Sequence, residues 1–411
     1  MISLKNPIRN IPTGEKLILF AGAVAYSTII YKYRIQMGDF GDFAKAGKMI
    51  WESIDPYSQL MYVNSPVSAV IVFGLNKALP FIFVPAFWQL LNLVGLIFFI
   101  RTIVNREYHR VIPIVVSIFA FLNVTRALFA NVQVTGLALG LIAVGITLVR
   151  NGNSAFISMI PIWLALEVKP QLSMGFIVIL LFQEKIQKLR IFALGIYVVL
   201  SHSIVELRYA GDINYLWIEK LLKYSSGSLK EGYEISFWKV IAIHLNHVPL
   251  VRLASLFAII AIFLSVIVMA LKGKTQWAIY FAMISPTLNS YLHLYDLAFV
   301  SLCLIMGMLI HKEPKFLIAT LVFCAIFPLN LTGLLLSTCV LSTLVFLSVR
   351  STDTKESYFK MILFTFPLSV LATELLNEES QELQMAEVLV VPVILMLILT
   401  RKQIVRMFNT I

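Results

Sequence analysis

Residues 250–271, LVRLASLFAIIAIFLSVIVMAL, carry one charged side chain, Arg252, in an otherwise apolar run. A helix needs about 20 mainly apolar residues to cross the hydrocarbon core of a bilayer. In lipid, only helices and closed barrels satisfy every backbone hydrogen bond. We therefore expect a membrane-spanning helix here, and runs of the same kind decide the fold of the rest of the chain.

The composition of the chain agrees with this expectation. Of 411 residues, 59% are hydrophobic and 13% are charged, against about 45–50% and about 25% in soluble globular proteins. This balance excludes soluble, disordered, collagen-like and disulfide-stapled classes. It predicts an all-α polytopic integral membrane protein with about 12–14 transmembrane helices. The candidate runs are 17–33, 83–101, 111–125, 132–149, 155–168, 170–183, 190–207, 250–271, 276–291, 294–310, 316–330, 331–349, 359–375 and 387–400.

Two long connections, 32–82 and 208–249, interrupt the runs, and we treat residues 1–411 as one integral membrane domain. The net charge of +11 comes from short basic clusters between the runs, which indicates loop anchors and no nucleic-acid partner. Short loops rich in Lys and Arg face the cytoplasm in membrane proteins. Most basic residues of this chain lie in alternate short loops, which we therefore place on the cytoplasmic side. This predicts a multi-pass protein of the inner (plasma) membrane, with both termini cytoplasmic and both long connections outside.

The first outer connection contains the densest polar cluster. Apolar and small residues recur there at three- and four-residue steps, which predicts an interfacial helix with Asp39 at its start. They are Phe40, Phe43, Ala44, Gly47, Ile50 and Trp51. Asp39 and the following Asp42 could simply cap this helix and complement its dipole. Alternatively, Asp39 is a general base held at the membrane surface. The run 66–79 is too short to span and predicts a short re-entrant or surface helix.

Further polar groups gather on the outer side by topology. Arg126 and Lys169 are the basic residues of the short outer connections, and His293 lies on another of them. Each has an ordinary interpretation as an interfacial anchor or helix end. Together, they could supply charge-assisted hydrogen bonds to a phosphate. No P-loop, G-x-G-x-x-G, H-E-x-x-H or nucleophile elbow is present, and no metal site is expected.

Several motifs follow the first span in order: Asp39-Phe40-x-x-Phe43-x-x-Ala46-Gly47, Asp55-Pro56-Tyr57, Tyr62, Pro66, Leu79-Pro80, and Trp88 with Asn92. Later come Asn131-x-Gln133, Lys169-Pro170, and Ser285-Pro286 with His293. In this order they resemble the bacterial membrane mannosyltransferases that use polyprenyl phosphate mannose. These enzymes belong to the GT-C superfamily and include the phosphatidylinositol-mannoside mannosyltransferases.

The resemblance implies a GT-C-like helical bundle that inverts the anomeric carbon of a hexose such as mannose. The implied partners are a lipid-linked sugar donor, a glycolipid or glycan acceptor on the outer face, and membrane lipids, without a further cofactor. Asp39 falls on the family's catalytic aspartate, and Lys169 and His293 fall near the donor phosphate. Topology and proximity add the remaining substrate-binding candidates: Arg126, Asp42, Tyr62, Asn64 and Tyr295.

Elementary chemistry agrees with this role, because a single displacement needs a base for the acceptor hydroxyl and cations for the leaving phosphate. The alternative is a polytopic lipid-linked-sugar transporter or flippase, which would hold buried charges within matched, broken helices. A non-catalytic membrane scaffold is the third possibility. Transfer of a labelled sugar would favour the enzyme, whereas binding without turnover would favour the other two.

Overall fold

The computed structural model describes residues 13–34, 38–60, 64–78, 84–120, 128–129, 132–182, 187–227, 247–288, 298–311 and 400–408, together with residues 125, 238, 241, 245 and 398. This part of the chain is helical apart from turns and one isolated bridge. Three of its helices are long and apolar enough to cross a membrane. They are α5 (Val84–Ile103), most of α11 (Gln187–Tyr209) and most of α14 (Val248–Leu271).

The expected all-helical membrane class is confirmed in this coarser form, but the expected number of spans is not shown. The runs 132–149, 155–168 and 170–183 do form helices, of 16, 14 and 13 residues, which are shorter than the about 20 residues of a standard span. The run 111–125 contains a helix of 8 residues. Runs 316–330, 331–349 and 359–375 lie outside the described residues, as does nearly all of 387–400.

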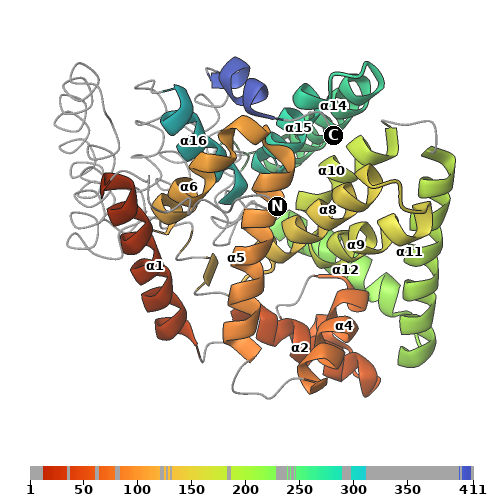
Figure 1. Cartoon of the computed structure of the whole chain (residues 1–411). Helices are drawn as coiled ribbons and strands as arrows, with labels where there is room; N and C mark the ends of the chain where they lie inside the picture. Colours follow the sequence, from red (N-terminus) through yellow and green to blue (C-terminus); the bar gives the residue numbers. More distant parts are fainter. Residues whose placement is uncertain are drawn as a thin grey trace.

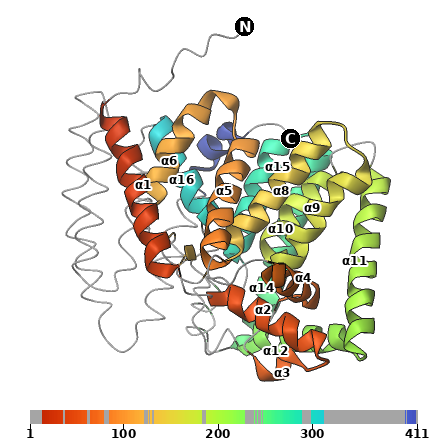
Figure 2. The same cartoon turned by 60° about the horizontal axis from the view of Figure 1, so that its bottom comes forward.

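The remaining described helices are α1 (Thr13–Tyr33), α2 (Gly38–Trp51), α3 (Pro56–Gln59), α4 (Pro66–Ala78), η3 (Arg106–Val111), α6 (Ile112–Phe119), α8 (Thr135–Arg150), α9 (Ala155–Val168), α10 (Pro170–Phe182), α12 (Ile213–Gly227), α15 (Thr275–Ile284), η4 (Ser285–Leu288) and α16 (Ala298–His311). Helices α5, α8, α9, α10 and α11 run side by side as a bundle (Figure 1). Helices α2, α3 and α12 lie across one end of it (Figure 2). We call this end, with α2, α3, α4 and α12, the site end.

Helices α5 and α8 cross with their backbones almost in contact. A Cβ atom on Gly95 would lie 2.1 Å from the carbonyl oxygen of Gly136, and one on Gly136 would lie 2.2 Å from that of Asn92. Small residues permit such close approach between membrane helices. The Asn92 side chain then accepts a hydrogen bond from the backbone N–H of Leu137, at 3.1 Å. This crossing therefore fixes the first turn of α8 against α5.

Three buried phenylalanines connect α5, α10 and α16. The ring of Phe99, on α5, lies 5.1 Å from that of Phe176 on α10 and 4.9 Å from that of Phe299 on α16. All three side chains are buried, and both contacts are edge-to-face, the arrangement that aromatic quadrupoles favour.

The outer faces of the long helices are apolar and exposed. On α14, Leu253, Leu256, Phe257, Ile260 and Leu264 recur at helical spacing and leave their side chains uncovered. An exposed apolar stripe of this length marks contact with a membrane or a partner. Because α14 is also long enough to span a bilayer, we interpret its stripe as a lipid-facing surface.

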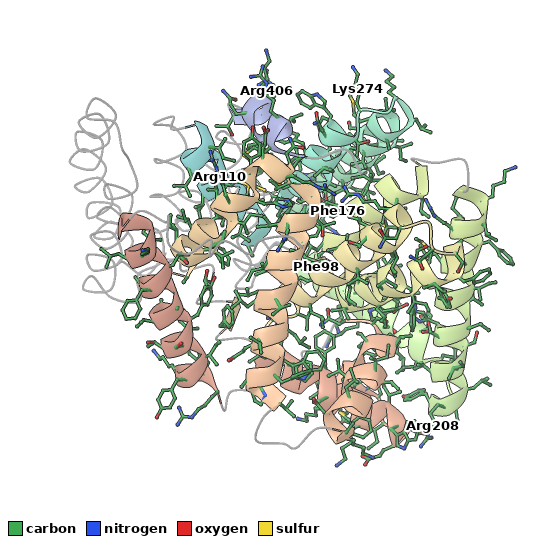
Figure 3. The ribbon with its side chains drawn as sticks, in the orientation of Figure 1. Phe98, Arg110, Phe176, Arg208, Lys274 and Arg406 are labelled. Atoms are coloured by element: carbon green, nitrogen blue, oxygen red, sulfur yellow. The ribbon has the colours of Figure 1, made fainter. Side chains whose placement is uncertain are left out.

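The end of the bundle opposite the site end is strongly basic. Arg110, Lys274 and Arg406 lie there, whereas Arg208 lies at the site end (Figure 3). Residues 400–408 pack into this basic end, where Asn105 donates a 2.9 Å hydrogen bond to the carbonyl of Arg406. The exposed cations at this basic end are Arg101, Arg106, Arg110, Arg150, Lys272, Lys274, Arg401, Lys402 and Arg406.

Candidate functional site

Helix α2 presents Asp39 at the site end through its amphipathic pattern. Its apolar side chains Phe40, Phe43 and Ile50 are buried, as the sequence predicts. The Phe40 ring packs 4.1 Å from the ring of Trp88 on α5, which anchors the start of the helix. Gly38 has φ +46°, a conformation that glycine adopts without strain, and it turns the chain into α2. Asp39 follows in the first helical turn and is partly exposed.

The carboxylate of Asp39 is bonded to a distant part of the chain. It accepts a hydrogen bond from the side-chain amide of Gln133, which is itself buried. Gln133 follows Val132, whose φ of +45° is unusual for a β-branched residue. Its own N–H donates to the carbonyl of Leu128 at 3.0 Å, which closes the turn. Strained backbone of this kind clusters at functional sites.

Lys169 reaches the same segment from another direction. It is the C-terminal cap of α9, where its N–H donates to the carbonyl of Ala165 at 3.0 Å. Its side chain is buried, and its ammonium group donates to the hydroxyl of Thr135 at 2.8 Å. Thr135 is the first residue of α8 and lies two positions after Gln133.

Asp39 and Lys169 are therefore both bonded to residues 133–135, which lead into α8. One of them offers a carboxylate and the other a buried ammonium, beside the N-terminus of a 16-residue helix. A helix N-terminus carries a partial positive charge that favours anions. The arrangement can take a proton at Asp39 and hold an anionic group at Lys169.

Asp42 lies one turn beyond Asp39 and is exposed. The surrounding protein atoms still displace enough water to raise its pKa, and the neighbouring carboxylate of Asp39 raises it further. Lys45 opposes both effects. In the described part of the chain, no group of three His, Cys, Asp or Glu side chains could hold a metal ion.

Other predicted residues have structural contacts or lie outside the described part. The backbone carbonyl of Asn64 accepts a hydrogen bond from the Tyr57 hydroxyl at 3.0 Å. Asp55 caps α3 by accepting from the Tyr57 N–H at 2.8 Å, as expected for a turn residue. Four of the predicted site residues, Tyr62, Arg126, His293 and Tyr295, lie outside the described part of the chain.

Two partners of the site are not predicted by the sequence. Gln133 stands out there only as part of an outer-side motif, and Thr135 has no distinguishing pattern. The sequence shows an amide and a hydroxyl beside the apolar run of α8. Buried polar groups need hydrogen-bond partners, so this combination is the sequence feature that could have identified the two residues. Their partners, however, come from α2 and α9, which only the fold brings together.

Fold and composition define the class: an all-helical membrane protein with a polar site at one end of its bundle. Comparisons with protein-family models, with curated proteins and with solved structures find no match. The function must therefore be inferred from the residues themselves.

Proposed function

We propose that this chain is a GT-C-like membrane glycosyltransferase with about 12–14 transmembrane helices. It moves a hexose such as mannose from a polyprenyl-phosphate donor to a glycolipid or glycan acceptor. The observation that carries the proposal is the bonding of Asp39 and Lys169 to Gln133 and Thr135, two positions apart. One base and one phosphate ligand are the minimum equipment for this reaction.

In the proposed reaction, an acceptor hydroxyl oxygen attacks the anomeric carbon of the donor sugar. Asp39 takes the hydroxyl proton as the new C–O bond forms, and a general base of this kind typically contributes about 10²–10⁴-fold. The bond between the anomeric carbon and the phosphate oxygen breaks, and its electron pair leaves with the polyprenyl phosphate. Lys169 stabilises the growing negative charge on that phosphate. A single displacement inverts the anomeric carbon.

The charge distribution supports an orientation for this reaction. The end opposite α2 carries exposed cations with few acidic residues, whereas the site end mixes exposed cations such as Lys45 and Arg208 with the acidic residues Asp39, Asp42 and Glu52. Basic residues are retained on the cytoplasmic side of membrane proteins. We therefore assign the site to the extracytoplasmic face of the plasma membrane and the basic end to the cytoplasm.

The test is transfer by the purified protein in lipid nanodiscs, given radiolabelled polyprenyl-phosphate mannose and a membrane glycolipid acceptor. The proposal predicts a labelled acceptor whose new linkage has the opposite anomeric configuration from the donor. Binding of the donor without transfer, together with its movement across reconstituted vesicles, would contradict the enzyme and favour the lipid-linked-sugar transporter. The absence of both binding and transfer would remove both assignments.

A further inference from the structure

A second polar cluster lies next to the site and takes no part in the proposed chemistry. Its centre is Glu167 on α9, whose side chain is 3% exposed. The Glu167 carboxylate accepts hydrogen bonds from the Ser65 hydroxyl and, at 3.2 Å, from the Trp163 indole. It also pairs with the Nε2 atom of His202 on α11, at 3.3 Å. A buried carboxylate with this set of partners calls for a specific explanation.

The other side of His202 is held by α12. Its Nδ1 atom lies 2.6 Å from the side-chain oxygen of Asn214. The Asn214 amide nitrogen donates to Glu206 at 2.7 Å, which assigns the Asn214 oxygen to His202. The His202 ring also stacks on the Trp217 ring, with centroids 5.6 Å apart and planes at 20°.

Both ring nitrogens of His202 therefore face oxygen acceptors, one on Glu167 and one on Asn214. A neutral imidazole can donate from one nitrogen only, whereas an imidazolium donates from both. The hydrogen-bond pattern thus describes an ion pair between the buried Glu167 and the largely buried His202, where the start of α4 meets α9, α11 and α12.

A buried ion pair adds little to stability, because desolvation offsets most of its attraction, and its clearest use is to fix one arrangement. The arrangement fixed here is the end of α9. Lys169 lies two residues after Glu167, and the turn between them and α10 is short. The carbonyl of Lys169 accepts a hydrogen bond from the Ser173 N–H at 3.1 Å, and the Ser173 hydroxyl donates to the carbonyl of Ala165 at 2.8 Å. A displacement of Glu167 therefore moves Lys169 with it.

We propose that Glu167 and His202 are positioning residues that lock the α9–α10 turn against α11 and α12 and so set the place of the Lys169 ammonium. The inference rests on the proposed role of Lys169 as a phosphate ligand. The pair is joined to Lys169 through the backbone between residues 167 and 169. It determines how well the site holds a lipid phosphate, while the proton transfer at Asp39 stays unchanged.

The test measures the Kd of polyprenyl phosphate, without sugar, for the purified full-length protein in nanodiscs. We compare wild type with Glu167→Gln, His202→Gln and the double variant. Because a misplacement of about 1 Å can reduce function about 10²-fold, we expect each single variant to bind at least about tenfold more weakly. Because the two residues act as a unit, the double variant should bind no more weakly than the worse single variant.

The surface pair Lys48–Glu52 supplies the control, since its charged atoms lie 3.8 Å apart and its side chains are 61% and 48% exposed. Glu52→Gln should leave the Kd unchanged. If Glu167→Gln does not fold, Asn214→Ala keeps the pair and removes one support of His202. It should weaken binding in the same direction by a smaller factor.

Folded Glu167→Gln and His202→Gln variants with the wild-type Kd would overturn the positioning role, and so would fully additive effects. Sugar transfer is measured on the same samples, so the two proposals fail separately. A wild-type protein that binds polyprenyl phosphate but transfers no sugar contradicts the glycosyltransferase and leaves the Kd comparison decisive for the pair. A wild-type protein that binds no polyprenyl phosphate overturns both.

Discussion

The side-chain amide of Gln133 donates a hydrogen bond to the carboxylate of Asp39, 94 residues earlier in the chain. This bond holds the carboxylate in one orientation. Because an amide N–H occupies one acceptor position of a carboxylate, the other lone pairs of Asp39 remain available to an acceptor hydroxyl. It also joins α2 to the segment that leads into α8, and Lys169 is bonded two residues further along that segment.

Replacing Gln133 tests this orientation. Gln133→Ala should lower kcat for sugar transfer about tenfold and leave the donor KM nearly unchanged, because the base loses its alignment while the phosphate contacts remain. Gln133→Glu should reduce kcat further, since two adjacent carboxylates repel each other and one of them takes up a proton. Steady-state transfer kinetics measure both. A kcat equal to wild type in Gln133→Ala would contradict the role of this bond.

Thr135→Val is the corresponding test at Lys169. The substitution keeps the shape of the side chain and removes the oxygen that accepts from the ammonium group, so a buried donor loses a partner. We expect a several-fold higher KM for the lipid-linked donor and a smaller change in kcat. Thr135→Ser retains the hydroxyl and should stay within about twofold of wild type. Equal donor KM values for the Val and Ser variants would speak against the contact.

The crossing of α5 and α8 predicts a stability effect. Gly136→Ala would place a Cβ atom 2.2 Å from the Asn92 carbonyl oxygen, so the helices must move apart. We expect this to lower the free energy of unfolding by about 1–3 kcal/mol. The Tm of the detergent-solubilised protein should fall clearly. Gly74→Ala is the matched control, because a Cβ atom at Gly74 meets nothing within 4 Å. Alanine is also the better helix former, so this variant should equal or exceed the wild-type Tm.

The raised pKa of Asp42 predicts a pH effect of defined sign. Its charged form is disfavoured in the folded protein by burial and by Asp39. The unfavourable contribution is therefore present at neutral pH and disappears as the pH falls through the raised pKa of Asp42 toward its ordinary value. Asp42→Asn should give a Tm equal to or above that of wild type at about pH 7, and the difference should vanish near about pH 4. A lower Tm for this variant at neutral pH would contradict the sign.

The local pattern of α2 was predictable, but its surroundings were not. Phe40, Phe43 and Ile50 are buried as their spacing predicts, because helical periodicity is a property of nearby residues. The same spacing predicts Trp51 on this apolar face, yet it is 46% exposed and lies under the guanidinium of Arg208, 4.4 Å from the ring centroid. That contact comes from α11, and a cation–π pair over such a sequence distance leaves no local signal.

The candidate site was likewise predictable in its residues and not in its contacts. Asp39 and Lys169 could be selected from the sequence, because charged residues are rare and costly beside apolar runs. Their bonds to Gln133 and Thr135 depend on the close crossing of α5 and α8 and on the turn at Val132. The pairing of Glu167 with His202 likewise joins α9 to α11. Hydrophobic pattern predicts which segments are helices, but it does not determine which polar side chains meet between them.

The central claim is that Asp39 removes the proton of the acceptor hydroxyl. It is tested most directly by the sugar-transfer rates of purified Asp39→Asn and Asp42→Asn variants, with matched Tm values as proof of folding. The amide introduced by Asp39→Asn keeps the size of the side chain but cannot take up the proton, so we predict a loss of about 10²–10⁴-fold in kcat. Asp42→Asn should retain most of the rate. A folded Asp39→Asn variant that transfers sugar at the wild-type rate would contradict the account.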